Sequence, residues 1–170
     1  IVTENITANG VVAILEFQVL ETAEDGAAEI VLILNEESTF NVDMEDVHFE
    51  TVSGSVYVGV QESTEPTEST TEQTEATGAR LEVGTANAQA GETVAVAIEL
   101  KENPGITALS FDVQYDTERL ELLGAKDGGI LEGASNTFGN DVTLVPYRLC
   151  WDAIVTENIT ANGVVAILEF

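Results

Sequence analysis

Apolar residues occupy every second position in four separate stretches of the chain. These positions are Ala13, Leu15, Phe17 and Val19; Val56, Val58 and Val60; Val94, Val96, Ile98 and Leu100; and Leu109, Phe111, Val113 and Tyr115. Successive side chains of a β-strand point to opposite faces of its sheet, so this alternation predicts strands with one buried and one outward face.

Turn-forming residues separate these strands at short intervals. Pairs or triplets with Gly, most of them also with Asn, Asp or Pro, stand at residues 9–10, 53–54, 90–91, 103–105 and 127–129. The unbroken apolar run of residues 30–34 predicts a strand covered on both sides. Only residues 117–123 could form a short helical turn. The expected fold class is therefore all-β, a jelly-roll β-sandwich of about nine strands.

One stretch has no such alternation. Residues 61–78 are rich in Thr, Ser and Glu and contain one Pro. They have little to bury, so they cannot offset the entropy lost on ordering. We expect an extended acidic linker whose like charges repel one another.

The sequence of residues 1–17 returns without a change at residues 154–170. A perfect match of this length indicates a tandem array or a deliberate permutation, and a cloning or assembly artefact would leave the same signature. We interpret residues 1–60 as the C-terminal part of one module and residues 79–170 as the N-terminal part of the next. Both parts can still build one module together, as circularly permuted halves. The chain ends inside an alternating run, so we expect neither end to be a native terminus.

The charge of the chain is extreme and unevenly distributed. It has 31 acidic and 5 basic residues, a formal net charge of −26, and no Lys or Arg in residues 1–78. Such a surface repels nucleic acid and anionic membranes, so we expect neither as a partner. No apolar run approaches the ~20 residues of a membrane span.

Residue types needed for common catalytic sites are scarce. His48 is the only histidine, so it supports neither a His-based metal site nor a catalytic triad, and we expect it at the surface. Cys150 is the only cysteine, which excludes an intramolecular disulfide, and we expect a partly buried, inert thiol. One Trp and three Tyr provide little lining for a glycosidase cleft. We expect no enzyme activity and no cofactor.

Five segments, taken in module order, resemble the cohesin modules of cellulosome scaffoldins. They are LEVGTANAQAGETVAVAIEL; GITALSFDVQYDTERLELL; YRLCWDA followed by ENITANGVVAILEFQV; VHFETVSGSVYV; and the Thr/Glu-rich linker directly after it. Thr117 departs from the family, which often has Pro after Tyr-Asp, and this affects only the turn. The order and spacing of the segments make the resemblance specific, and it covers the chain outside the linker. It implies a cohesin-like fold.

The resemblance also implies a partner. Cohesins are non-catalytic modules that bind dockerins, the small calcium-loaded helical domains carried by enzymes. This chain would then be part of an extracellular bacterial scaffold, secreted or attached to the cell surface, that assembles polysaccharide-degrading enzymes. Calcium is expected on the dockerin partner and not on this chain, whose sequence contains no EF-hand-like loop.

The resemblance places the dockerin-binding site on outward side chains of one sheet. Alternation supports this direction on the strand of Leu149 and Trp151, which are expected to point inward. Ala108, Cys150 and Met44 would give the face an apolar centre within a charged rim. The candidate partner-binding residues are Ala108, Ser110 and Asp112; Arg148, Cys150, Asp152 and Ala153; and Asn41, Asp43, Met44 and Glu45.

Two other functions fit an array of β-sandwiches. A carbohydrate-binding jelly roll predicts an exposed row of aromatic residues, and the sequence suggests none. A passive adhesin or stalk repeat predicts no apolar patch and no partner. The cohesin-like motifs decide in favour of the scaffold. Because either copy of the duplicated segment can fill the same position in a sheet, we also expect strand-swapped self-association to be open to the chain.

Overall fold

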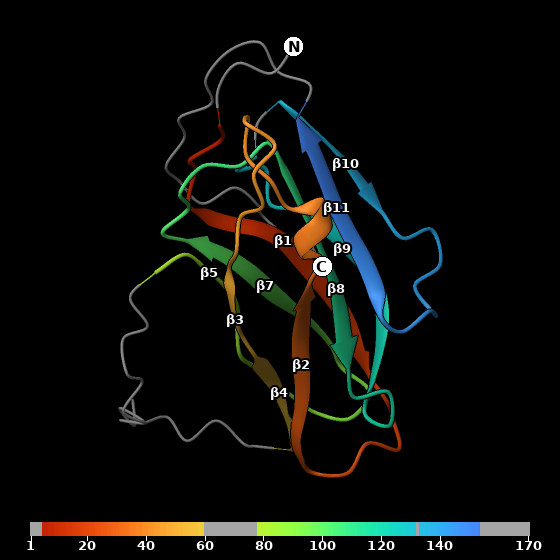
Figure 1. Cartoon of the computed structure of the whole chain (residues 1–170). Helices are drawn as coiled ribbons and strands as arrows, with labels where there is room; N and C mark the ends of the chain where they lie inside the picture. Colours follow the sequence, from red (N-terminus) through yellow and green to blue (C-terminus); the bar gives the residue numbers. More distant parts are fainter. Residues whose placement is uncertain (1–4, 60–77, 132, 154–170) are drawn as a thin grey trace.

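Two β-sheets packed face to face make up the fold (Figure 1). The computed structural model describes residues 5–59, 78–131 and 133–153; apart from Gly78, the expected linker lies outside them, as does the second copy of the repeat. Within the described residues, the single helical segment is a 3-10 turn, η1 (Glu36–Ser38). The strands are β1 (Gly10–Val19), β2 (Gly26–Leu34), β3 (Glu50–Val52), β4 (Gly54–Val58), β5 (Arg80–Val83), β6 (Ala86–Ala88), β7 (Thr93–Lys101), β8 (Ala108–Tyr115), β9 (Leu120–Asp127), β10 (Ala134–Phe138) and β11 (Tyr147–Ala153).

The expected all-β sandwich is confirmed. The strands number eleven in the described residues against about nine expected, and the three-residue strands β3 and β6 account for the excess. No helix in the part of the chain that the structure describes has the length and apolar character to cross a membrane.

Strands from the two parts of the chain interleave in both sheets. The five-stranded sheet has the order β3-β5-β7-β1-β9, and the six-stranded sheet has the order β10-β11-β8-β2-β4-β6. β1 therefore pairs on both sides with strands of the later part, β7 and β9, and β2 pairs with β8. The described residues of 1–60 and 79–170 thus form one sandwich, as expected for circularly permuted halves. Their origin in two successive modules stays a prediction.

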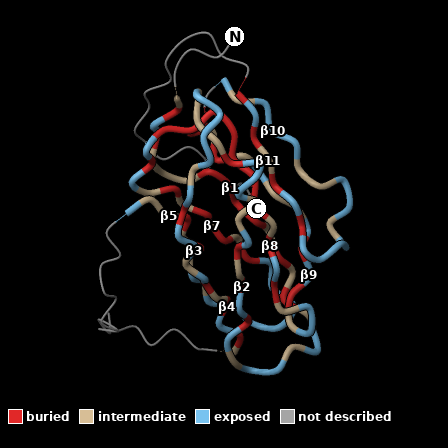
Figure 2. Tube along the Cα trace, viewed as in Figure 1, coloured by how far each residue is buried: buried red, intermediate tan, exposed pale blue. Residues whose placement is uncertain are grey.

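The core lies between the sheets, where the inward faces of the strands meet (Figure 2). Leu15 and Phe17 of β1 are fully buried, as the alternation predicts. Trp151 is 1% exposed, and its ring centroid lies 5.6 Å from that of Phe111 and 5.1 Å from that of Phe138. Its expected inward direction is confirmed. Burial of side chains of this size contributes about 1.5–3 kcal/mol each.

One local expectation is wrong, and a second is confirmed in part. Ile33 is 45% exposed, so the apolar run of residues 30–34 forms a strand covered on one side only. The short helical turn that residues 117–123 could form is limited to residues 117–119, where the N–H of Leu120 donates to the carbonyl of Asp116, and β9 begins at Leu120. The strand forms because Leu120 and Leu122 enter the core from alternate positions.

Two chain segments cross side by side from one sheet to the other. β3 pairs in parallel with β5 in the five-stranded sheet, and β4 pairs in parallel with β6 in the six-stranded sheet. Gly54 stands at this crossing, where an added Cβ would lie 2.1 Å from the carbonyl oxygen of Gly84. Glycine is therefore required for the close approach of the two backbones.

A buried amide joins the residues before β1 to the turn after β7. Asn103 is 8% exposed, and its Nδ2 donates to the carbonyl oxygens of Ile6 (3.0 Å) and Ala8 (2.8 Å). Its Oδ1 accepts the N–H of Gly105 at 3.0 Å. One side chain thus satisfies three backbone groups, two of which are more than 90 residues away in the sequence.

We predict that Asn103→Ala lowers the free energy of unfolding by at least about 2 kcal/mol, because buried polar groups left without a partner cost about 1–3 kcal/mol each. Urea denaturation followed by Trp151 fluorescence measures the change. Asn87→Ala, at an exposed position of β6, is the control and should change stability by less than about 0.5 kcal/mol. Equal losses in both variants would contradict the role given to Asn103.

Candidate functional site

The outward side of the six-stranded sheet carries the candidate site. Register places Arg148 of β11 opposite Asp112 of β8, and Asp112 opposite Ile33 of β2, so these three form a row across three strands. Val31 and Gln114 are paired along the same two strands. The name outer face is used for the set Val31, Ile33, Asp112, Gln114, Arg148, Cys150 and Asp152.

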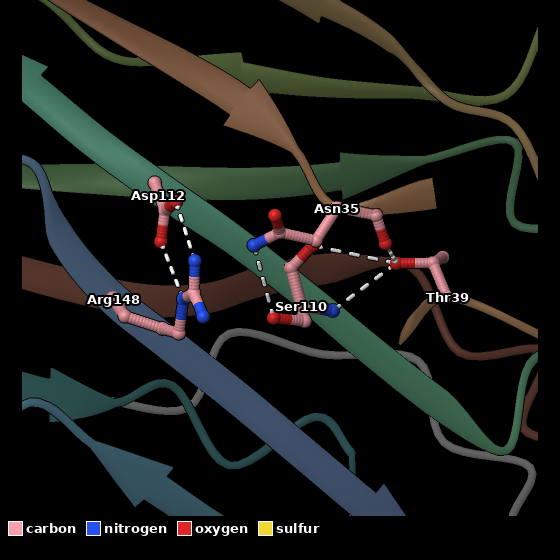
Figure 3. Close-up of polar contacts among 5 residues, drawn as sticks. All are labelled: Asn35, Thr39, Ser110, Asp112 and Arg148. Atoms are coloured by element: carbon pink, nitrogen blue, oxygen red, sulfur yellow. Dashed lines mark hydrogen bonds and ion pairs between the residues drawn. The ribbon is translucent and has the colours of Figure 1, made fainter. Parts of the chain in front are cut away.

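A bidentate ion pair lies at the centre of the outer face (Figure 3). Arg148 Nε donates to Asp112 Oδ1 at 2.7 Å, and Arg148 Nη2 donates to Asp112 Oδ2 at 2.9 Å. The Asp112 side chain is 13% exposed, whereas that of Arg148 is 62% exposed. The hydrogen bonds from Arg148 hold the pKa of Asp112 below its usual value, although burial opposes the effect. The Asp112 carboxylate is therefore held in one position, while the Arg148 side chain remains accessible to a partner.

Ile33 gives the outer face an exposed apolar contact beside this pair. It stands between two open hollows along β2. One hollow is lined by Leu34, Asn35, Glu36, Glu37, Ser38 and Arg148, and the other by Ala27, Glu29, Val31, Gln114, Tyr115 and Asp116. An exposed apolar side chain surrounded by charged residues is typical of a protein-binding surface.

Sequence reasoning missed Ile33 and Val31 as site residues. The signal was present in the sequence, because both are the outward positions of the apolar run of residues 30–34. An apolar outward position on a strand is unusual when that face is solvated. They were not predicted as site residues, because the strand was expected to be covered on both sides.

A side-chain network replaces the sheet ladder where β2 ends (Figure 3). The N–H of Asn35 donates to the Ser110 carbonyl at 2.9 Å, and Asn35 Nδ2 donates to Ser110 Oγ at 3.3 Å. The backbone then leaves the sheet as η1, and Thr39 Oγ1 accepts the N–H of Ser110 at 3.2 Å. Thr39 Oγ1 also donates to the Asn35 carbonyl at 3.1 Å. The hydroxyl of Thr39 thus satisfies the β8 backbone in place of a strand.

This network covers two predicted site residues. Ala108 and Ser110 point outward from the sheet as predicted, yet each is only 3% exposed. Phe40 forms a bridge with Ala108, so the segment after β2 continues beside the end of β8. The expectation that Ala108 and Ser110 are accessible is wrong, because each is buried where this segment, distant in sequence, packs against β8. Ala153 is also buried, at 8% exposed, and its N–H donates to the Thr107 carbonyl.

The third predicted patch is a tight turn at the margin of the outer face. Asn41 Oδ1 accepts the N–H groups of Asp43 (2.9 Å) and Glu45 (3.0 Å). Asp43, Met44 and Glu45 are exposed as expected, with Met44 at 71%, whereas Asn41 is half-buried. The turn lies near the Ala108 end of β8 because Phe40 directly precedes it. Since Ala108 is buried, the apolar centre expected from Ala108, Cys150 and Met44 does not form, and Ile33 is the apolar side chain beside the ion pair.

The remaining predicted residues lie on β11. Arg148 and Asp152 are exposed and Cys150 is half-buried, all on the outward side as alternation predicts. Burial, followed by the charge of Asp152, raises the pKa of the Cys150 thiol, so little thiolate is present at neutral pH. His48 is exposed, with its Nδ1 2.8 Å from Glu36 Oε1. Across the described residues, no group of three or more His, Cys, Asp or Glu side chains is placed to hold a metal ion.

The ion pair predicts an acid-dependent contribution to stability. The pKa of Asp112 is lowered in the folded state, so its contribution is present above the unfolded pKa and is lost as the pH falls through the folded pKa. We expect the difference in unfolding free energy between the parent and Asp112→Asn to shrink as the pH falls from 7 toward 3. Denaturant unfolding at several pH values measures it.

Arg148→Gln is the matched control for this prediction, because it removes the partner and keeps the carboxylate. It should flatten the same part of the pH dependence. If the parent and Asp112→Asn differ by the same amount at every pH, Arg148 does not stabilise the ionised carboxylate.

Comparison with known proteins agrees with this architecture. The family model described as the cohesin domain matches residues 79–170. The chain is 28% identical over 127 residues, or 74% of its length, to cellulose-binding protein A of Clostridium cellulovorans. It is 31% identical over 173 aligned residues, or 96% of its length, to cellulosomal-scaffolding protein A of Acetivibrio thermocellus. The chain spans 6% and 9% of these two relatives. No solved structure matches the chain.

Proposed function

Because the chain belongs to the cohesin domain family, we propose that it is a non-catalytic scaffold module that binds dockerin domains through the outer face. The observation that carries the proposal is the row of Ile33, Asp112 and Arg148, in which an exposed apolar side chain lies next to an ordered ion pair. Backbone hydrogen bonds to both neighbouring strands hold β8 in the middle of this row. A partner would therefore meet a preorganised surface.

The shape of the outer face supports a helical partner. The face is the side of a sheet, and it spans β2, β8 and β11 without a deep cleft among the described residues. A helix laid across these strands would bury Ile33 beside the ion pair and place polar residues at the rim. Interfaces with a desolvated centre and a charged rim draw most of their affinity from few residues.

The charge of the chain supports a basic partner surface. Exposed carboxylates lie on the outer face, as Asp152 does, and beside it, as Glu29, Glu36 and Glu37 do. Arg148 is paired with Asp112, so it does not offset them. A partner with Lys or Arg at its rim would be steered toward this side of the molecule.

The wider role follows from the relatives, one of which is named a cellulosomal-scaffolding protein. We expect an extracellular bacterial scaffold, secreted or attached to the cell surface, that holds enzymes near a polysaccharide and raises their effective concentration. The module itself would perform no catalysis. Calcium would be bound by the dockerin, and this chain would need no cofactor. At high protein concentration we also expect neighbouring chains to be able to exchange the duplicated strand.

The described residues favour this function over the two alternatives. Tyr57 is the one aromatic side chain among the exposed large hydrophobic residues of the described chain, so it cannot form the row that a carbohydrate-binding face requires. A passive stalk has no need for an exposed Ile33 beside an ordered ion pair on one face.

We predict tight one-to-one binding of a dockerin that is lost when calcium is removed. Isothermal titration of the full chain against a panel of dockerins, with calcium and again with chelator, measures it. Ile33→Asp should weaken binding at least about 10-fold, because it replaces the exposed apolar contact of the outer face with a charge.

Leu123→Asp is the matched control, because Leu123 is equally exposed at 45% but lies on β9 in the other sheet. It should leave the affinity unchanged. No binding across a broad panel would refute the proposed function, and equal losses in both variants would remove the outer face as the site.

The surrounding carboxylates predict that association slows as salt increases. The association rate constant should fall by roughly 10-fold or more between low and physiological ionic strength, with a smaller change in the dissociation rate. Surface plasmon resonance at several NaCl concentrations measures both. An association rate that does not respond to salt would show that the acidic charge does not steer the partner.

A further inference from the structure

The segment that occurs twice in the sequence includes an interior strand of a sheet. β1 lies between β7 and β9, and residues 10–17 of this strand belong to the duplicated sequence. Four of them, Val12, Ala13, Leu15 and Phe17, have no exposed surface. The sandwich therefore requires one copy of this sequence, and the chain contains two.

The end of β11 lies beside the start of the first copy. The N–H of Ala153 donates to the Thr107 carbonyl at 2.7 Å, and Ile6 pairs with Ile106, the residue directly before Thr107. The counterpart of Ile6 in the second copy is Ile159, five residues after residue 154. Five residues can span up to about 16–18 Å. This is enough to connect Ala153, which lies beside Thr107, to a residue that pairs with Ile106.

We propose that the place of β1 between β7 and β9 is a binding site for either copy, so that residues 154–170 of the same chain can replace residues 1–17. The two sequences are identical, so the apolar side chains of either copy would occupy the same positions in the core. Asn103 would donate its two hydrogen bonds to backbone carbonyl oxygens in either case, and these carry no information about which copy is bound. The two arrangements therefore differ only in where the strand is joined to the rest of the chain.

The boundary of the exchange is set by residues outside the repeat. Gln18 and Val19 complete β1 but are not duplicated. Val19 is fully buried; its N–H donates to the Glu92 carbonyl at 2.8 Å, and its carbonyl accepts the N–H of Gly91 at 3.0 Å. These two residues would remain in place in both arrangements and keep β2 anchored to the sheet. In the first arrangement the strand is joined to Gln18, and in the second it is joined to Ala153.

Matched substitutions in the full chain test the proposal. Leu15→Asp places a charge at a fully buried position of the first copy, and Leu168→Asp changes the corresponding residue of the second. Each single variant should fold with an equilibrium constant only about two-fold below the parent, since one of two equivalent arrangements is lost. The double variant should lose the cooperative unfolding transition. Circular dichroism and urea denaturation of all four proteins provide the readout.

Three outcomes would overturn the proposal: Leu15→Asp unfolds the chain while Leu168→Asp has no effect, both single variants unfold it, or the double variant remains folded. Val19→Asp is the control outside the repeat, and it should destabilise the chain with no rescue. Light scattering of Leu15→Asp at low protein concentration should show a folded monomer. A variant that folds only as a dimer would place the second copy in a neighbouring chain and refute the intramolecular assignment.

Discussion

The rest of the structure depends on strands of the early part of the chain pairing between strands of the later part. β1 has no neighbour from its own part, since both of its partners, β7 and β9, come after the linker sequence. Without β1, β9 would be separated from the rest of the five-stranded sheet, and the facing edges of β7 and β9 would be unpaired. Without the later part, β1 would be an isolated apolar strand, which is not stable in water. The sandwich therefore forms through the association of both parts, and its core belongs to neither alone.

The outer face depends on the same constraint in the other sheet. β8 pairs with β11 of its own part on one side and with β2 of the early part on the other, so Ile33 lies beside the Arg148–Asp112 pair only when both parts are assembled. The Thr39 hydroxyl then continues the ladder past the end of β2 and fixes the path of η1. A surface made from three strands with paired backbones changes little on binding, which is the property that a docking module requires.

Alternation could predict direction but not exposure. The inward direction of Leu149 and Trp151 and the outward direction of Cys150 and Asp152 follow from the period of a strand, which is a local property. Whether an outward residue meets solvent depends on what lies over it. Ala108 and Ser110 are buried where residues 35–40, about 70 positions away in the sequence, pack beside β8, as the bond between Thr39 and Ser110 shows. Ile33 was missed for the opposite reason: nothing in the described chain covers it, although its apolar neighbours suggested a fully buried strand.

The duplicated strand and the outer face lie in different sheets, and this separates the two properties of the chain. β1 is part of the five-stranded sheet, whereas Ile33, Asp112 and Arg148 belong to the six-stranded sheet. The nearest covalent link between them is the turn from β1 to β2, and Gln18 and Val19 hold its start whichever copy is bound. Exchange of the copies would thus leave the register of β2 against β8 unchanged. A module that can be completed by either of two identical segments would then present the same binding face in both arrangements.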